Sequence, residues 1–444
     1  MDEQNPNPQA PSTDPVSVPA GNRRRQPRSQ RQIFKEKYLP FIILATAGLL
    51  CLSFIFGSMD MRRNRDTVKA KEDRITQLLD DEARDLKTRA AAMAAAYDYE
   101  NAMKLLAGYS GGLANRSELL QMYNSYKNAL NDLVVWNDLS KIPNLSFRTL
   151  VTDLDKAAAD PDRGSRYASR HITTDEFTRI LEQLYENGYV LVSLSDFAMP
   201  YTAQDGSVGV NMTSIRLPEG KKPIILTSEG DNYYSHTEKC GGFADMLTVN
   251  ASGELVCVDT AGNEGAFGFV PVLNAFLAGH PDFSYEGARA TIALSGYEGL
   301  FGMELSQSEA IRKVAATLRS HGYDIACYTY ADMEYADFGA AGVKEDLEKW
   351  STQITPILGD VDILVYPTGG DIKGREAYAG SKYDTLHDFG FRYFVGTGNG
   401  ETWGMTTTQY ARQIRTVVTA SNLAEHPEWY TGLFDAAAVL SPDR

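Results

Sequence analysis

Short apolar runs alternate with amphipathic segments from residue 143 to the end of the chain, and this alternation limits the fold more than any other feature. The apolar runs, rich in β-branched residues, lie at 189–194, 223–227, 291–296, 324–330, 362–369 and 391–398. The amphipathic segments between them include 173–188, 306–322 and 344–359. Such alternation predicts an α/β protein with a parallel sheet, most simply a closed β/α barrel over residues 142–444. Its chemistry would lie at the carboxyl ends of the strands.

The ends of the amphipathic segments support this assignment. The first begins at Thr173, a residue that caps helices, and acidic residues follow it. All three segments end at a glycine, namely Gly188, Gly322 and Gly359, as helices commonly do.

The first 59 residues divide into a polar tail and an apolar run. Residues 1–37 are Pro-rich and then basic, with seven Lys and Arg between Arg23 and Lys37, so we expect a disordered cytoplasmic tail. Residues 39–59 carry no charge, which predicts a transmembrane helix over 38–59. The run has no suitably placed signal-peptide cleavage site, so we expect it to stay as a single-pass anchor. The flanking basic residues nearly balance, so charge does not set the orientation.

Residues 60–141 are predicted to form a helical stalk. No proline occurs over 66–138, and residues 94–106 and 117–136 flank a glycine-containing break at 109–112, which indicates a helix-turn-helix. A spacer packed against the next domain is favoured, because no stacking repeats follow. A module that binds a protein partner is the alternative.

Charge and cysteine content exclude two classes of protein. Residues 66–444 hold 33 Lys and Arg against 53 Asp and Glu, and this acidic character argues against nucleic acid as a partner. Four cysteines without a Cys-x-x-Cys pair indicate neither a disulfide scaffold nor a zinc ribbon. Cys240 and Cys257 flank a predicted hairpin turning at residues 250–253, and a disulfide between them is left open.

Four segments resemble the polysaccharide deacetylase family of carbohydrate esterases, in a membrane-anchored bacterial branch. They are TTDEFTRILEQLYENGYVLVSLSDF (173–197), KKPIILTSEGDNYY (221–234), DIACYTYADMEY (324–335) and ILVYPTGG (363–370). The resemblance implies a distorted β/α barrel over about residues 142–440. It also implies a divalent metal, usually zinc, that removes acetyl groups from N-acetylated sugars of chitin, peptidoglycan or related glycans.

The metal-site positions that this resemblance implies are substituted. The family's Asp pair, a base and a ligand, aligns with Glu229 and Gly230, and its two histidine ligands align with Tyr328 and Asp332. A histidine pair of this branch likewise aligns with Asn144 and Arg148. We therefore expect a degenerate site that uses no metal or other cofactor, with Glu229 at the former base position.

A rebuilt metal site is the alternative for the acidic residues. Pairing Glu229 with Asp231 and adding Asp332 would give three carboxylates, which suit calcium or magnesium. The favoured interpretation is that these are solvated loop acids. The six histidines are dispersed along the sequence, so they do not restore a zinc site.

Aromatic residues are frequent where the predicted strands end. Tyr233, Tyr234, Tyr297, Tyr328 and Tyr366 are candidates to stack against sugar rings. Packing in the barrel mouth is the equally weighted alternative for about half of them.

These observations predict a membrane-anchored pseudo-deacetylase, with its large domain outside the cell membrane, that binds or scaffolds cell-wall or surface glycan without catalysis. An active deacetylase with an altered metal site is one alternative. An interaction protein that acts through its stalk is the other.

Overall fold

The computed structural model describes residues 41, 44–45, 61–204, 206, 208–442 and 444. The chain divides into two units, Met1–Leu78 and Leu79–Arg444. The predicted tail, residues 1–37, and all but three positions of the predicted membrane segment, 38–59, lie outside the described residues. Of the helices that the described residues form, none has the length and apolar character needed to cross a membrane.

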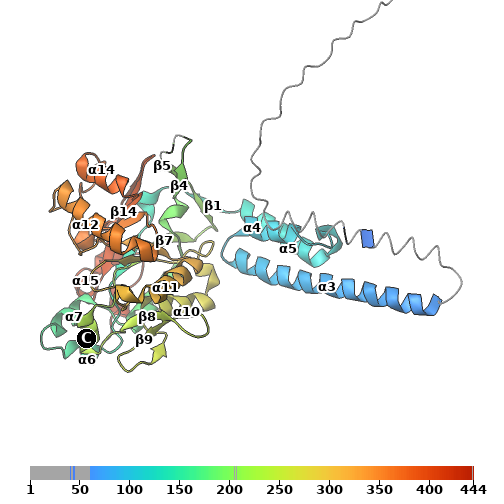
Figure 1. Ribbon diagram of the computed structural model, residues 1–444, viewed down its shortest axis with the longest axis horizontal. Helices are drawn as coiled ribbons and strands as arrows, with labels where there is room; N and C mark the ends of the chain where they lie inside the picture. Colours follow the sequence, from blue (N-terminus) through green and yellow to red (C-terminus); the bar gives the residue numbers. More distant parts are fainter. Residues whose placement is uncertain (1–40, 42–43, 46–60, 205, 207, 443) are drawn as a thin grey trace, which may run out of the picture. The chain divides into compact units, whose positions relative to one another are not determined.

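Seven parallel strands close into a barrel within the described chain (Figure 1). Going round the barrel, the order is β2, β7, β11, β12, β13, β14 and β16, and β16 pairs again with β2. The strands span Asn144–Phe147, Lys222–Ser228, Thr291–Leu294, Asp324–Cys327, Ile363–Val365, Tyr393–Gly398 and Ala411–Val418, in that order. The predicted closed α/β barrel is therefore confirmed.

The barrel departs from regularity at β7. The first half of β7 pairs with β3 (Tyr189–Leu191), and only its last two residues, Thr227 and Ser228, pair with β11. β3 thus lies outside the closed ring, although its sequence resembles that of the ring strands. Another irregularity is β15 (Gly404–Thr406), which runs antiparallel to β16.

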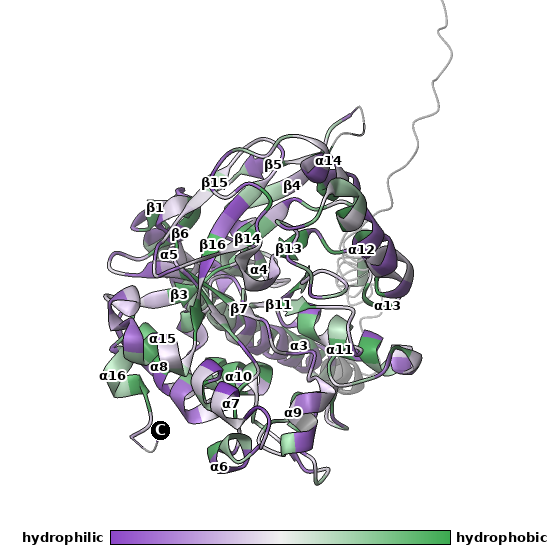
Figure 2. Cartoon of the chain, turned by 90° about the vertical axis from the view of Figure 1, so that its left-hand side faces the viewer, coloured by the Kyte–Doolittle hydropathy of each residue, from purple (hydrophilic) through white to green (hydrophobic). Residues whose placement is uncertain are grey.

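Alternate residues of the ring strands face opposite layers. Leu145, Phe147 and Leu226 belong to the larger hydrophobic core, which they share with α8 (Thr174–Glu186), α10 (Phe269–Gly279) and α11 (Ser308–Ser320). Ile225 and Val395 belong to a second core, inside the barrel. Figure 2 shows the helices placed around the strands. This period of two is why each strand carries both apolar and polar side chains.

The capping signals in the sequence form as expected. Thr173 accepts the amide N–H of Glu176, and the Glu176 carboxylate accepts the amide N–H of Thr173, which completes a capping box for α8. Gly188 follows the helix with φ of 80°, a conformation that favours glycine.

The stalk contains α3 (Met61–Ala95), α4 (Tyr99–Ala107) and α5 (Ser117–Asn131). α4 and α5 form the predicted helix-turn-helix around a small core that includes Ala90, Leu106 and Leu119. The prediction of helix through Trp136 is wrong. Residues Val134–Trp136 form β1, antiparallel to β6 (Ile215–Leu217), because the β-branched pair Val134 and Val135 suits a strand.

The other elements lie between the ring strands along the chain or follow the last of them, β16. Their strands are β4 (Ala198–Thr202), β5 (Val208–Met212), β8 (Met246–Val249), β9 (Leu255–Val258) and β10 (Glu264–Gly265). Their helices are α6 (Leu154–Ala158), α7 (Gly164–Arg170), α9 (Ser235–Cys240), α12 (Ala340–Gln353), α13 (Thr355–Leu358), α14 (Ser381–Asp388), α15 (Ala420–Glu425) and α16 (Ala436–Val439). β8 and β9 form the predicted hairpin.

A buried polar layer crosses the barrel interior between three strands. The side-chain amide of Asn144 donates to Gln413 Oε1 (3.1 Å), and its oxygen accepts the Thr227 hydroxyl (3.1 Å). Gln413 in turn donates to the carbonyl oxygen of Ile142 (2.6 Å). Each polar group in this layer therefore has a partner away from water, which buried polar groups require.

We expect Asn144→Ala to lower the free energy of unfolding by roughly 2–4 kcal/mol, because it opens a cavity and removes the partner of the Gln413 side-chain oxygen and of the Thr227 hydroxyl. Chemical unfolding followed by circular dichroism measures the change. Asn131→Ala, at the exposed end of α5, is the matched control and should stay within about 0.5 kcal/mol of the parent. Equal stabilities of the two variants would contradict this account of the layer.

Candidate functional site

The residues implicated by the sequence meet at the carboxyl end of the barrel. Glu229 follows β7, Tyr328 follows β12, and Tyr366 follows β13. In a parallel barrel these positions share one end. Arg148 follows β2 in the same way, one step beyond the pairing of Phe147 with Ser228, so it lies level with Glu229.

An ion pair with Arg415 holds the Glu229 carboxylate inside the barrel. Arg415 is completely buried, and its Nε donates to Glu229 Oε1. Its terminal nitrogens donate to the carbonyl oxygens of Val395 (3.1 Å), Gly396 (3.0 Å) and Tyr366 (2.9 Å). The Tyr328 hydroxyl donates to Glu229 Oε2 at 3.0 Å. Both partners are therefore fixed by several strands at once.

This pairing decides the proton affinity of Glu229. Burial by itself would raise the pKa of Glu229, but the charge and hydrogen bond of Arg415 outweigh burial and lower it. A general base works best with a pKa near the operating pH, so the pairing makes Glu229 a weak base. The geometry suits a structural ion pair.

Gly230 has no room for any side chain. A Cβ at this position would come within 1.9 Å of the Thr149 amide nitrogen and 2.5 Å of its Cα. The Thr149 hydroxyl donates to the Gly230 carbonyl oxygen at 2.8 Å. The loop after β7 thus lies directly against the loop after β2, and a carboxylate ligand at this position does not fit.

The chain beyond Gly230 turns into the core. Asp231 is buried, and its Oδ1 accepts the Tyr233 hydroxyl at 3.1 Å, while that hydroxyl is 3.3 Å from the Cys257 sulfur. The interpretation of Glu229 and Asp231 as solvated loop acids is therefore wrong, because an arginine stabilises one and the core encloses the other. Asp332 is exposed, as that interpretation expected.

The described residues contain no group of three or more His, Cys, Asp or Glu side chains placed to hold a metal ion. Glu229 already pairs with Arg415, and Gly230 supplies no ligand atom, so the residues at the family's ligand positions do not fit a metal. The three-carboxylate alternative does not fit either, because Asp231 faces Tyr233.

The structure separates the five candidate tyrosines into two groups. Tyr233, Tyr328 and Tyr366 are buried, so protein covers their ring faces. Tyr234 is half-buried and shares a 2.8 Å hydrogen bond with the Ser295 hydroxyl. Tyr297 is 55% exposed, and its ring centroid lies 6.0 Å from that of Tyr234. Only this pair offers ring surface to a ligand among the five.

Backbone strain gathers in the same loops. Eight non-glycine residues in the described chain have positive φ, and six of them follow ring strands at this end: Tyr233, Glu298, Phe301, Thr329, Asp332 and Thr368. Each such residue costs of order 1–3 kcal/mol and needs surrounding structure to hold it, and strain of this kind clusters at functional sites.

Cys240 and Cys257 are both free. The Cys257 thiol lies in the core against Tyr233, and the Cys240 thiol donates to the carbonyl oxygen of Thr237 at 3.2 Å. The possible disulfide between them is therefore not formed.

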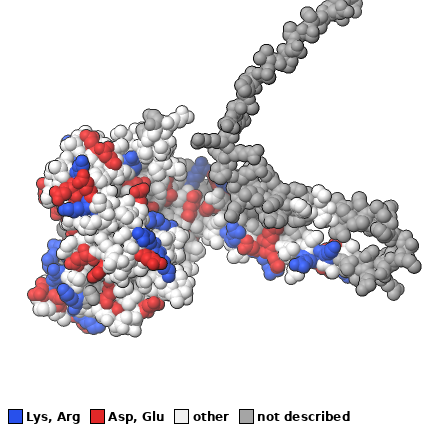
Figure 3. Space-filling view, viewed as in Figure 1, with Lys and Arg blue, Asp and Glu red and all other residues white. Residues whose placement is uncertain are grey.

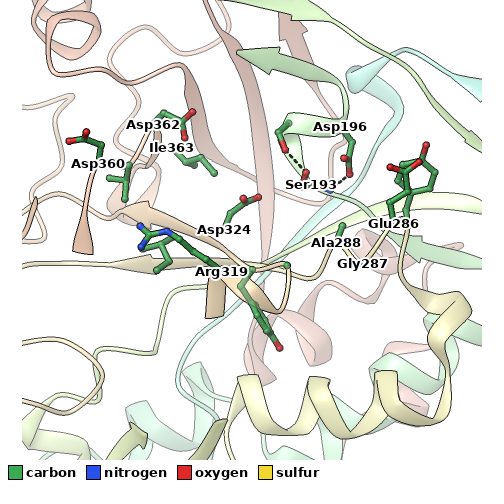
Figure 4. A pocket seen from close by; sticks show the side chains of 16 residues that line it. Ser193, Asp196, Glu286, Gly287, Ala288, Arg319, Asp324, Asp360, Asp362 and Ile363 are labelled. Atoms are coloured by element: carbon green, nitrogen blue, oxygen red, sulfur yellow. Dashed lines mark hydrogen bonds between the residues drawn. The ribbon is translucent and has the colours of Figure 1, made fainter. Parts of the chain in front are cut away.

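A cavity of about 440 Å³ opens near the starts of β12 and β13, at the other end of the barrel (Figure 4). Asp196, Asp324 and Asp362 line it. Burial raises the pKa of Asp324 to about 7, and the charges of Asp196 and Asp362 add to the rise. Burial likewise raises the pKa of Asp196 to about 6. None of the candidate residues from the sequence lines this cavity.

No family model matches the chain, and no curated protein does. A comparison with solved structures does find similarity. A Streptococcus pyogenes deacetylase, PplD, in complex with acetate, aligns with 64% of this chain and 94% of its own at 12% identity and a TM-score of 0.33.

Sequence reasoning missed Arg415, because it missed the whole of β16. Arg412, Gln413 and Arg415 interrupt the apolar pattern of this strand, and all three are buried. The signal that could have revealed it is the acidic residue at a buried strand end, Glu229, since a buried carboxylate needs a cationic partner.

We expect Gly230→Asp to disrupt folding instead of restoring a metal ligand, because its Cβ would overlap the backbone of Thr149. Overpacking of this kind costs at least 1–3 kcal/mol, and here backbone must move, so we expect about 3 kcal/mol or more. Gly279→Ala, at the end of α10 with no atom within 4 Å of the new Cβ, is the control. A stable Gly230→Asp protein that binds one zinc ion would contradict this.

We expect Asp231→Asn to stabilise the protein more at about pH 7.5 than at about pH 4. Burial raises the pKa of Asp231 to about 6, so the folded chain holds this proton more tightly than the unfolded chain. Ionisation then costs stability progressively from about pH 4 to pH 6, up to roughly 1–3 kcal/mol. Melting temperatures across this range test it, and a constant difference between variant and parent would contradict it.

Proposed function

We propose that the carboxyl end of the barrel binds a glycan without removing its acetyl groups. The observation that carries the proposal is the pair of accessible rings, Tyr234 and Tyr297, at the same end of the barrel at which Arg415 neutralises Glu229. Amphipathic rings with a hydroxyl group suit sugar rings, because the ring face packs and the hydroxyl bonds. The sequence resemblance to polysaccharide deacetylases supports a glycan as the ligand.

The absence of catalysis is proposed from the residues at the former metal positions. Gly230 has no ligand atom and no space for one, and Glu229 has a lowered pKa. The alternative is a deacetylase with an altered site. Exposed Asp332, in a left-handed backbone conformation next to the strained Thr329, is the observation that favours it, because such strain accompanies active sites.

The proposal includes a place for the protein at the cell membrane. The uncharged run at 39–59 supports a single-pass anchor over residues 38–59, and cell-wall glycan as ligand supports an extracytoplasmic barrel. The stalk would then hold the barrel away from the bilayer. Tyr97 and Ala96, between α3 and α4, bond the main chain of Asp282 and Glu286 at 2.7 Å each, which supports a spacer more than a separate partner-binding module.

We expect Tyr234→Ala and Tyr297→Ala each to weaken the binding of peptidoglycan or chitin fragments by about 1–3 kcal/mol, because each removes an aromatic anchor. Tyr297→Phe should cost less, since it keeps the ring. Tyr201→Ala, an exposed tyrosine on β4, is the control. Calorimetry with and without a chelator measures the affinities.

Chelator should leave the affinity unchanged, and the purified protein should show no deacetylation. One tightly bound zinc ion per chain, together with activity that Asp332→Ala abolishes, would replace this proposal with the deacetylase alternative. Equal binding by all the tyrosine variants would remove the aromatic pair from the site.

A further inference from the structure

Arg148, at the carboxyl end of the barrel, lies near two carboxyls, because its charge acts to lower the pKa of Glu229 and of Asp332. It continues the alternation of β2, in which Asn144 and Ser146 are the buried polar positions, and it lies level with Glu229. Its buried Nε has no hydrogen-bond partner, and within the described chain its guanidinium forms no ion pair. Glu229 forms its ion pair with Arg415 and not with Arg148, although the charge of Arg148 also lowers the pKa of Glu229.

Two more arginines, Arg166 and Arg170, lie near Arg148. One hydrogen bond fixes the chain segments that carry these residues. The Nδ1–H of His171 donates to the carbonyl oxygen of Thr149 at 2.7 Å, so the residue after Arg148 is fixed to the residue after Arg170. Arg166 and Arg170 lie four residues apart on α7, which puts them on the same helix face, about 6 Å apart along the axis. Both are exposed, and neither has an ion-pair partner among the described side chains.

The three positive charges act on one another. Burial lowers the pKa of Arg170, and the charges of Arg148 and Arg166 lower it further. His171 adds no charge, since burial above all, together with the neighbouring arginines, lowers its pKa to about 4. On the face of the barrel that Figure 3 draws, acidic and basic side chains are mixed. Three arginines that lie together and form no ion pair within the described chain repel one another, and an anionic ligand would relieve this repulsion.

A row of rings connects α7 to the exposed tyrosine pair. The Tyr167 hydroxyl, on α7, donates to the His236 carbonyl oxygen at 3.0 Å. Ring centroids are 6.1 Å apart for Tyr167 and His236, 5.8 Å for His236 and Tyr234, and 6.0 Å for Tyr234 and Tyr297. The helix that carries Arg166 and Arg170 is therefore linked to the accessible rings through the buried Tyr167 and through His236.

We infer that the glycan recognised here is anionic, and that Arg148, Arg166 and Arg170 hold the carboxylate or phosphate groups along its chain. This inference rests on the proposed function, because the tyrosine pair supplies the contact with the sugar rings. Guanidinium groups bind both kinds of anion through paired N–H donors. Because three arginines lie near one another, a polymer with repeated charges is favoured as the ligand over a single anionic sugar.

Calorimetry of the full-length protein in non-ionic detergent tests the inference with two probes that differ in charge alone: an oligomer of galacturonic acid and its fully methyl-esterified form. A short poly(glycerol phosphate) and a neutral chitin oligomer extend the comparison to phosphate and to an uncharged N-acetylated chain. The variants are Arg148→Gln and the pair Arg166→Gln with Arg170→Gln. Arg216→Gln, an exposed arginine on β6 without an ion-pair partner in the described chain, is the matched control.

We expect at least one of the two acidic polymers to bind about tenfold or more tighter than the neutral probes, and added salt to remove this preference. Arg148→Gln should lower that affinity about tenfold and leave neutral binding unchanged, and Arg216→Gln should change neither. Equal affinity for charged and neutral probes, or a preference unaffected by the three arginines, would overturn the inference and leave the proposed function standing. If the protein binds no glycan at all, or binds only anionic lipid vesicles, both this inference and the proposed function are overturned.

Discussion

The ion pair between Glu229 and Arg415 is the interaction on which the carboxyl end of the barrel depends. Arg415 reaches from β16 to the end of β7 and also bonds carbonyl oxygens of β13 and β14, so a single guanidinium joins four strands. Removing either partner would leave the other charge buried, which costs about 3–5 kcal/mol. The same contact lowers the pKa of Glu229, so this carboxylate is a weak base.

Close approach of two backbones is the second constraint. Because Gly230 lies against Thr149, the loops after β7 and β2 cannot separate to admit a ligand atom at this position. The same contact fixes Arg148, which immediately precedes Thr149, at the edge of the barrel mouth. The lack of space for a ligand atom at Gly230 and the position of Arg148 thus have a single steric cause.

The surface around the mouth retains the features of a binding site. Its strained loops and accessible rings fit recognition of a sugar chain, and the arginines of α7 extend it beyond the strand ends. These features lie on loops, and loops that bind ligands are separate parts of the fold from the strands that support them.

The sequence by itself determined the α/β barrel, five of its seven ring strands together with β3, the caps of α8 and the helix-turn-helix of the stalk, because periodicity and capping are local properties. It also placed Glu229 and Gly230 at the end of a strand. Only the tertiary structure decided that Arg415 neutralises Glu229, that Asp231 is buried, and which tyrosines stay accessible. The physical reason is that burial and ion pairing depend on contacts between distant residues, and Arg415 and Glu229 are 186 residues apart. The charged residues of β16 also interrupt the apolar pattern by which a buried strand is predicted.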